Sequence, residues 1–208
     1  HSKAGNGKTF IVLDMALHIA SGKSDWFGSK VRNGFVVYLA GEGHSGLSSR
    51  MKAWDENFKP ENKVNFLMSR YGTDLDTAYG LALVSHSIRK LPEKPVLIVV
   101  DTLHRFLSGD ENSSQDANKM LKNCEELTKE FGCAVLFVHH TGNDADKQGR
   151  ARGSSAWRGA VETDISIQRK DDNGPISIHL TKSKNMEMLK PIAVELKKVV
   201  VADWLDED

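Results

Sequence analysis

The stretch SKAGNGKT, residues 2–9, decides how the rest of this sequence is interpreted. It matches the pattern GxxxxGK followed by Ser or Thr, except that Ser2 stands at the position of the first glycine. Glycines let such a loop curl until its backbone N–H groups point at phosphate oxygens, and the following helix adds its positive N-terminal end. The stretch therefore predicts a loop that binds the phosphates of ATP. Its expected nucleotide contacts are Ser2, Lys3, Ala4, Gly5, Asn6, Gly7, Lys8, Thr9 and the adjoining Phe10.

Two side chains of this region have specific expected roles. Lys8 neutralises the β- and γ-phosphates, and the Thr9 hydroxyl is a ligand of Mg²⁺. A second ligand of Mg²⁺ is predicted at Asp101, because it ends the apolar run 96–100. An acid at the end of a buried strand beside a phosphate-binding loop is the arrangement that holds magnesium in ATPases.

A carboxylate that activates water is expected at Glu42, in the segment LAGEG. Glu42 follows the first apolar run after the helix of the phosphate loop. ATP hydrolysis needs a carboxylate to orient or deprotonate the attacking water. Glu42 fits this role if its strand lies next to the strand of the phosphate loop; otherwise it is an acid in a solvated loop.

Histidines and cations follow later elements of the sequence. His139 and His140 end a predicted strand, where one of them could report the nucleotide state and the other be structural. Segments 150–152 and 182–184 place cations after sheet elements, where they could reach a phosphate. A pair of charges alone more often marks a solvated face.

Apolar runs alternate with helical patterns through the first two thirds of the chain. The expected helices are 8–21, 46–58, one capped by Thr73 or Asp74 and running to about residue 91, and 114–131; the expected strands are 34–40, 64–68, 96–100 and 134–138. This pattern predicts an α/β fold, a mostly parallel twisted sheet with helices on both faces. Stretches 164–168 and 176–181 flank the turn signal 171–174, and extended stretches 192–196 and 199–202 follow, so an antiparallel C-terminal extension of the same sheet is expected.

Composition excludes several classes of protein. Lys plus Arg equals Asp plus Glu at 28 each, so binding to nucleic acid must rely on a local basic patch. Cys124 and Cys133 form no CxxC motif, which argues against structural zinc or a disulfide scaffold and favours a reducing, cytoplasmic setting. No run approaches the roughly 18 apolar residues of a membrane span, so no membrane association is expected.

We expect residues 1–208 to form one ATPase domain. A phosphate-binding loop normally follows a buried strand, and no strand precedes this one. The sequence is therefore expected to be part of a longer chain that contains that strand.

The order of motifs resembles a known family. SKAGNGKT, LAGEG, LIVVDTLHRF, VLFVHH, RGSS and LTKSKN follow one another between residue 2 and about residue 185. This order is similar to that of RecA-type P-loop ATPases, and most closely to the RepA and DnaB-like hexameric helicases of plasmids and phages. The resemblance implies a RecA-like core, ATP and Mg²⁺, and a homo-oligomeric ring, expected to be a hexamer.

The resemblance also implies roles for single residues. Glu42 looks like the catalytic glutamate, and His140 matches the nucleotide sensor. Arg152 is similar to the arginine finger that reaches the ATP of a neighbouring subunit. The basic pair that also points across the interface corresponds to Lys182 and Lys184.

Two further contacts are implied. Arg50, on the helix after Glu42, is expected to touch the nucleotide. The loop 141–153 stands where relatives carry a DNA-contacting loop, with Lys147 and Arg150 as candidates for binding single-stranded DNA.

Four functions stay open at this point. The leading one is a DNA-dependent ATPase motor of the replicative helicase type. A recombinase or repair ATPase that forms filaments is the nearest rival. A small-molecule P-loop kinase would use the same phosphate loop. A kinase must exclude water, however, so a water-activating Glu42 would be out of place in it. A regulatory ATPase that assembles on ATP is mildly favoured by the zero net charge.

Overall fold

The computed structural model describes residues 1–3, 5–140, 154–171 and 174–201. Its centre is a parallel four-stranded sheet with strand order β4-β3-β5-β6. These strands are apolar over almost their whole length because both faces of the sheet are covered. The bounds are β3 (Phe35–Ala40), β4 (Phe66–Met68), β5 (Pro95–Asp101) and β6 (Ala134–Val138).

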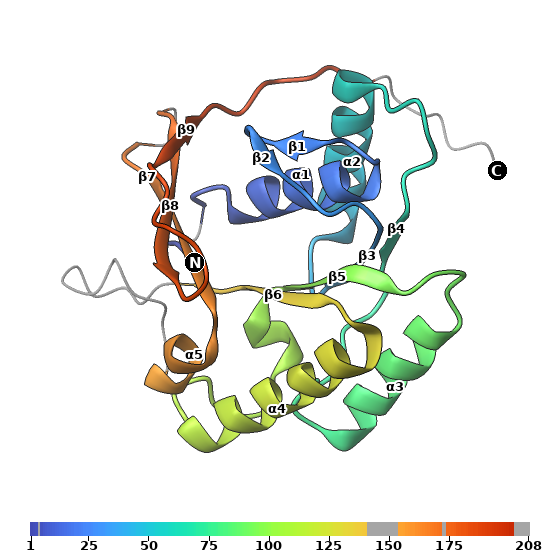
Figure 1. Ribbon diagram of the computed structural model, residues 1–208, viewed down its shortest axis with the longest axis vertical. Helices are drawn as coiled ribbons and strands as arrows, with labels where there is room; N and C mark the ends of the chain where they lie inside the picture. Colours follow the sequence, from blue (N-terminus) through green and yellow to red (C-terminus); the bar gives the residue numbers. More distant parts are fainter. Residues whose placement is uncertain (4, 141–153, 172–173, 202–208) are drawn as a thin grey trace.

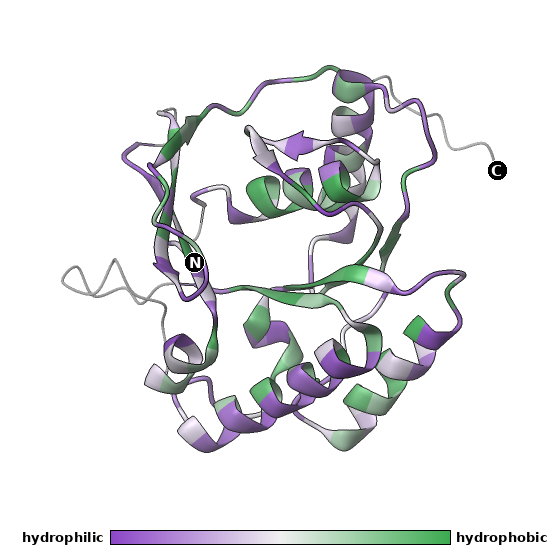
Figure 2. Cartoon of the chain, viewed as in Figure 1, coloured by the Kyte–Doolittle hydropathy of each residue, from purple (hydrophilic) through white to green (hydrophobic). Residues whose placement is uncertain are grey.

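Helices cover both faces of this sheet, as the sequence predicts (Figure 1). On one face lie α1 (Lys8–Ala20) and α2 (His44–Phe58); on the other lie α3 (Ala78–Arg89) and α4 (Ser114–Phe131). Successive strand residues point to opposite faces, so Tyr38 and Val99 join the core under α1, whereas Val37 joins the core under α4. Figure 2 shows the hydrophobic strands between the two helical layers, whose outer surfaces carry the polar residues.

Local signals set most helix boundaries. Ser113 caps α4 by accepting a hydrogen bond from the Asp116 backbone N–H, and Gly132 ends the helix in the left-handed conformation at φ 68°. The expected cap of α3 at Thr73 or Asp74 is wrong, because Thr77 accepts from the Gly80 backbone N–H at 3.0 Å.

Residues 73–77 are not helical because tertiary contacts hold them. Leu75 is fully buried, and its backbone N–H donates to the Phe106 carbonyl at 2.8 Å. This contact fixes the segment that leads into the helix, and α3 begins after the Thr77 cap.

The C-terminal strands form an antiparallel sheet of their own, with order β7-β8-β9. The expectation of one continuous sheet is therefore wrong in detail. His1 and Ser2 link the two sheets: the Ile167 backbone N–H donates to the His1 carbonyl at 2.9 Å, and Ser2 forms a parallel bridge with His140. The bounds are β7 (Thr163–Arg169), β8 (Ile176–Ser183) and β9 (Ile192–Val194).

After β9 the chain leaves the sheet, so residues 199–201 form no strand (Figure 1). The Lys197 ammonium donates to the Asn57 side chain at the end of α2, 2.8 Å away. Contact with α2 therefore replaces the expected last strand.

Four short elements had no sequence signal. They are the hairpin of β1 (Asp25–Trp26) and β2 (Ser29–Lys30), the 3-10 helix η1 (Leu103–Phe106) and the helix α5 (Ser155–Ala160). Both cysteines are buried and unbridged. Among the described helices, none is long and apolar enough to cross a membrane.

Candidate functional site

The phosphate loop has the backbone that its glycines predict. Gly5 and Gly7 adopt φ values of 81° and 87°, in the left-handed region that favours glycine. Gly7 precedes α1 and, as a glycine, offers no side chain to cap the first turn of this helix. A Cβ on Gly7 would lie 2.7 Å from Ile176 Cδ1, so the antiparallel sheet supports the loop from behind. The N–H groups at the start of α1 remain suited to an anion.

Lys8 lies at the centre of this loop and is only 6% exposed. Its ammonium donates to the Lys3 carbonyl at 2.8 Å, to the Ser2 carbonyl at 3.1 Å and to Ser2 Oγ at 3.2 Å. Burial lowers the pKa of Lys8 to about 8, opposed by the nearby charge of Asp101. A buried ammonium among neutral acceptors fits a phosphate group, because an anion would offset its desolvation. Ser2, which replaces the usual first glycine, supplies two of these acceptors.

Asp101 is the last residue of β5, on the face of the sheet that α1 covers, and it is 5% exposed. Tyr38 donates a hydrogen bond to its Oδ2 at 2.5 Å. Burial raises the pKa of Asp101, whereas hydrogen bonds from Tyr38 and Thr9 and the charge of Lys8 act against that rise. The Thr9 hydroxyl and the Asp101 carboxylate are thus in contact, and hard oxygen donors of this kind suit Mg²⁺.

The condition set for Glu42, a strand next to that of the phosphate loop, is not met. Its strand, β3, neighbours β4 and β5, and two strands separate it from Ser2. Glu42 still reaches the site, because Ala40 pairs with Asp101 and the Gly41 backbone N–H donates to the Asp101 carbonyl at 2.7 Å. Its charge raises the pKa of Asp101, which places the two carboxylates at the same edge.

Arg105 belongs to this edge and was missed from the sequence. It lies in η1, and its guanidinium donates to Glu42 Oε2 from Nε at 2.9 Å and from Nη2 at 2.6 Å. A Cβ on Gly41 would lie 2.3 Å from Arg105 Cβ, so the glycine before Glu42 makes room for the arginine stem. The only sequence signal that could have indicated Arg105 as a site residue is its position soon after Asp101.

His139 and His140 point in opposite directions, as neighbours on a strand do. Burial lowers the pKa of His140, and the charge of Lys8 lowers it further, so the ring is neutral near pH 7. Its Nδ1 therefore accepts from the Lys8 ammonium at 3.2 Å. His139 lies instead against Trp157, with Nε2 3.6 Å from Glu111 Oε2, which is the position of a structural histidine.

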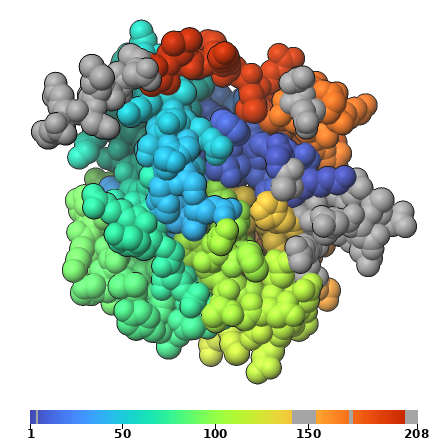
Figure 3. Space-filling view, turned by 180° about the vertical axis from the view of Figure 1, so that it is seen from behind, coloured from blue at the N-terminus to red at the C-terminus, as the bar shows by residue number. Residues whose placement is uncertain are grey.

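Arg50 and Phe10 come together beside the phosphate loop. The Arg50 guanidinium carbon lies 4.0 Å from the centre of the Phe10 ring, a cation–π contact. Figure 3 shows the blue α1 region and the light-blue start of α2 side by side on one face of the molecule. Arg50 and Phe10 therefore pack against each other beside the phosphate loop, and their expected contact with the nucleotide stays a prediction.

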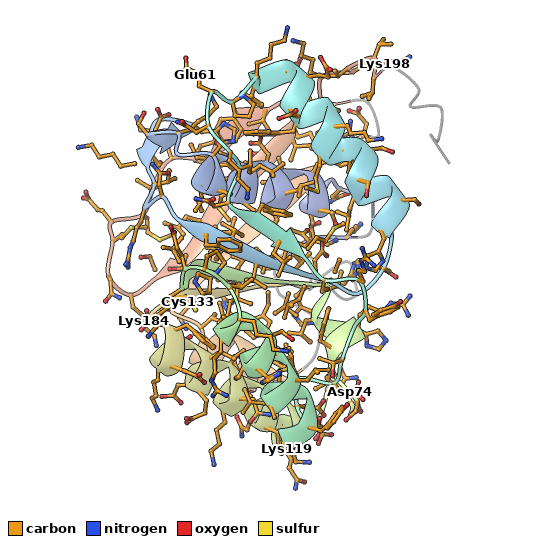
Figure 4. The ribbon with its side chains drawn as sticks, turned by 90° about the vertical axis from the view of Figure 1, so that its right-hand side faces the viewer. Glu61, Asp74, Lys119, Cys133, Lys184 and Lys198 are labelled. Atoms are coloured by element: carbon orange, nitrogen blue, oxygen red, sulfur yellow. The ribbon has the colours of Figure 1, made fainter. Side chains whose placement is uncertain are left out.

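Lys182 does not point toward this site. Its ammonium donates to the carbonyls of Arg158, Gly159 and Val161, at 2.5, 3.3 and 2.7 Å, and so holds the end of α5. Lys184 is exposed, and Figure 4 shows it on the opposite side of the view from Asp74.

Other expected site residues lie outside the described residues. They are Ala4, Lys147, Arg150 and Arg152.

A largely apolar cavity of about 780 Å³ runs beside β6. It lies between the outer edge of that strand and β7, with side chains of α1 and α4 on its walls. Its lining reaches Lys8 and His139, whereas Asp101 and Glu42 lie outside it. The polar edge described above is therefore separate from most of this cavity.

The fold and this edge define a RecA-like P-loop ATPase, a class whose members use ATP and Mg²⁺. The family described as "AAA domain" matches residues 2–146, more than half of the chain, so the chain belongs to that family. Among solved structures, the chain is similar to the RadB recombinase, with a TM-score of 0.64 and 12% identity over 95% of this chain and 85% of that one.

Proposed function

We propose that the protein is a DNA-associated ATPase motor of the RepA-like helicase type that hydrolyses ATP at the interfaces between its subunits. The observation that carries this proposal is the meeting of four side chains at one edge of the sheet. Lys8 contacts His140, the charge of Lys8 acts on Asp101, and the charge of Glu42 acts on both Asp101 and His140.

Each side chain has a role in this proposal. Lys8 and the N-terminus of α1 bind the phosphates of ATP, and Thr9 and Asp101 hold Mg²⁺. Glu42 orients the attacking water and accepts its proton. His140 accepts a hydrogen bond from Lys8 in this structure. It would lose that partner when Lys8 binds a phosphate instead, and His140 would thereby sense the bound nucleotide.

We place the site at a subunit interface because Arg105 and Lys182, two cations of the same subunit, already have partners within it. Arg105 is paired with Glu42, and Lys182 with the carbonyls at the end of α5. The developing charge of phosphoryl transfer needs more positive charge than Lys8 supplies. We assign this role to Arg152 of a neighbouring subunit, assisted by the exposed Lys184; such an arginine accelerates hydrolysis by about 10³–10⁵. Identical head-to-tail interfaces either close into a ring or extend as a helix; we propose the ring, with six subunits.

Mixed assemblies test the interface directly. Glu42→Gln and Arg152→Ala variants are each expected to bind ATP and to hydrolyse it at least a hundredfold more slowly than wild type. When the two are mixed, some sites combine an intact Glu42 with an intact Arg152 from the neighbour, so activity should reappear. A mixture as inactive as its parts would overturn the shared site, and full activity of Arg152→Ala alone would overturn its role.

Single-stranded DNA is the proposed partner, through Lys147 and Arg150. We expect DNA to stimulate turnover and Lys147→Ala/Arg150→Ala to lose that stimulation while keeping basal turnover. Binding should weaken steeply with salt, since contacts to phosphates release counterions. Stimulation by DNA that is equal in the variant and wild type would remove these residues from the interface.

A recombinase-type ATPase is the second candidate, favoured by the similarity of the fold to the RadB recombinase. The two candidates differ in assembly, which electron microscopy with ATP and single-stranded DNA would reveal. Closed rings support the helicase type, and filaments along the DNA support the recombinase type. Transfer of phosphate to a small acceptor, with no hydrolysis, would instead indicate a kinase.

A further inference from the structure

The buried side chain of Tyr38 ends in a polar group aimed at the site. Tyr38 lies in the middle of β3 and is fully buried in the core under α1. Its Cα pairs with Val99 on β5, two residues before Asp101, so Tyr38 and Asp101 share one face of the sheet. The hydroxyl reaches Asp101 Oδ2 at 2.5 Å across 63 positions of the sequence.

The surroundings of Tyr38 explain its ring but not its hydroxyl. The ring packs among apolar side chains, including Phe66 at a centroid distance of 5.8 Å. A phenylalanine would fill this space equally well. Among the described residues, this hydroxyl has one hydrogen bond, the bond to Asp101. Burial keeps the hydroxyl protonated by raising the pKa of Tyr38.

The hydrogen bond from Tyr38 holds Oδ2, one of the two oxygen atoms of the Asp101 carboxylate. The Thr9 hydroxyl, in the phosphate loop, also lies beside Asp101 and acts to lower the pKa of the carboxyl group. With Oδ2 held by Tyr38, the carboxylate cannot rotate freely, and its remaining oxygen has a defined direction. Partners that orient a metal-binding carboxylate typically contribute about 10–100-fold to metal affinity.

We infer that Tyr38 is a positioning residue for the magnesium site: its hydroxyl holds Asp101 so that the carboxylate and the Thr9 hydroxyl can receive Mg²⁺ together with ATP. The inference rests on the proposed function, in which Asp101 and Thr9 hold that ion. It adds Tyr38, the residue directly before the LAGEG motif in β3.

The test uses Tyr38→Phe, which removes a single oxygen atom. Tyr79→Phe is the matched control, because Tyr79 is 75% exposed on α3. Binding of a fluorescent ADP is measured in EDTA and then during titration with Mg²⁺. We expect Tyr38→Phe to bind ADP in EDTA as wild type does, and to need about tenfold more Mg²⁺ for half-saturation. Coincident Mg²⁺ titrations of Tyr38→Phe and wild type would overturn the inference.

A second comparison separates orientation of Asp101 from a general effect on the fold. In an Asp101→Asn background no carboxylate depends on the hydroxyl, so adding Tyr38→Phe should leave the Mg²⁺ requirement unchanged. An equal further increase in both backgrounds would show that Tyr38 does not act through Asp101, and would overturn the inference.

The same series tests the proposed function separately. If Asp101→Asn alone has the Mg²⁺ requirement of wild type, Asp101 does not hold the ion, and both the proposed metal site and the role of Tyr38 fail. If Asp101→Asn raises the requirement and Tyr38→Phe does not, the metal site stands and only the role of Tyr38 fails.

Discussion

Arg105 donates two hydrogen bonds to one oxygen of Glu42, at 2.9 and 2.6 Å, across 63 positions of the sequence. Both side chains are about half exposed, at 54% and 51%. An ion pair with this exposure contributes about 0–1 kcal/mol, so it can be broken easily. The proposed water-activating carboxylate is therefore held by an arginine of its own subunit through a weak contact.

Removing this contact should release Glu42. We expect Arg105→Ala to raise ATP turnover without DNA, by up to about fivefold, because about 1 kcal/mol corresponds to that factor. Steady-state turnover at saturating ATP measures the effect. Arg89→Ala, which breaks the exposed Arg89–Glu130 pair elsewhere, is the matched control. Turnover as low as that of Glu42→Gln would show that Arg105 is needed for catalysis instead.

The packing of Gly41 on Arg105 gives a second prediction. An alanine Cβ at position 41 would lie 2.3 Å from Arg105 Cβ, so Gly41→Ala must displace η1 or the segment before Glu42. We expect a loss of about 1–3 kcal/mol in the free energy of unfolding and at least tenfold lower turnover. Gly46→Ala is the control, because a Cβ at Gly46 in α2 meets no atom within 4 Å. Gly46→Ala should raise the free energy of unfolding by about 0.5–1 kcal/mol, because alanine favours the helix more than glycine does. Equal behaviour of the two variants would contradict this packing.

Lys182 should contribute to stability more than Lys184 does. Its ammonium donates to three carbonyls around the end of α5. Lys182→Ala leaves these acceptors without that donor, so we expect a loss of about 1–2 kcal/mol, seen as a lower urea midpoint. Lys184→Ala should stay within about 0.5 kcal/mol of wild type. If Lys182→Ala is as stable as wild type yet lowers turnover, the lysine acts at the interface that its sequence position suggests.

Alkaline pH should destabilise the protein through Cys124. Burial raises the pKa of this thiol to about 12. Above its ordinary pKa near 8.5 the unfolded chain loses the proton while the folded protein keeps it. The folded state then binds more protons, so stability falls as pH rises, by up to about 1.4 kcal/mol per pH unit. Urea unfolding of wild type and Cys124→Ala between pH 8 and 10.5 isolates this slope; parallel curves would contradict it.

Local signals explain why much of the fold could be predicted. The bounds of α4 and β6 match the sequence expectation because Ser113 caps the helix and Gly132 ends it. The expected start of α3 is too early, because the sequence does not show that Leu75 is held by the Phe106 carbonyl before the Thr77 cap.

The residues of the candidate site likewise fall into two groups, those indicated by local motifs and those placed by distant contacts. Residues 2–9 and Asp101 are indicated by motifs, because a phosphate loop and a strand-ending acid are short patterns with local geometry. The contacts of Tyr38 and Arg105 are with residues dozens of positions away in the sequence. The ammonium of Lys182 is hydrogen-bonded to carbonyls of another element. No local pattern carries that information.

The phosphate loop, the apolar strands and the alternation of strands and helices can thus be derived from the amino-acid sequence. These features follow from residue periodicity, glycine conformations and capping side chains, all of which act within a few residues. The placement of β3 beside β5, which brings Glu42 and Asp101 to one edge with Arg105, arises only when the whole chain packs. Strand order and register depend on how distant segments pack against both faces of the sheet, and packing is a property of the whole chain.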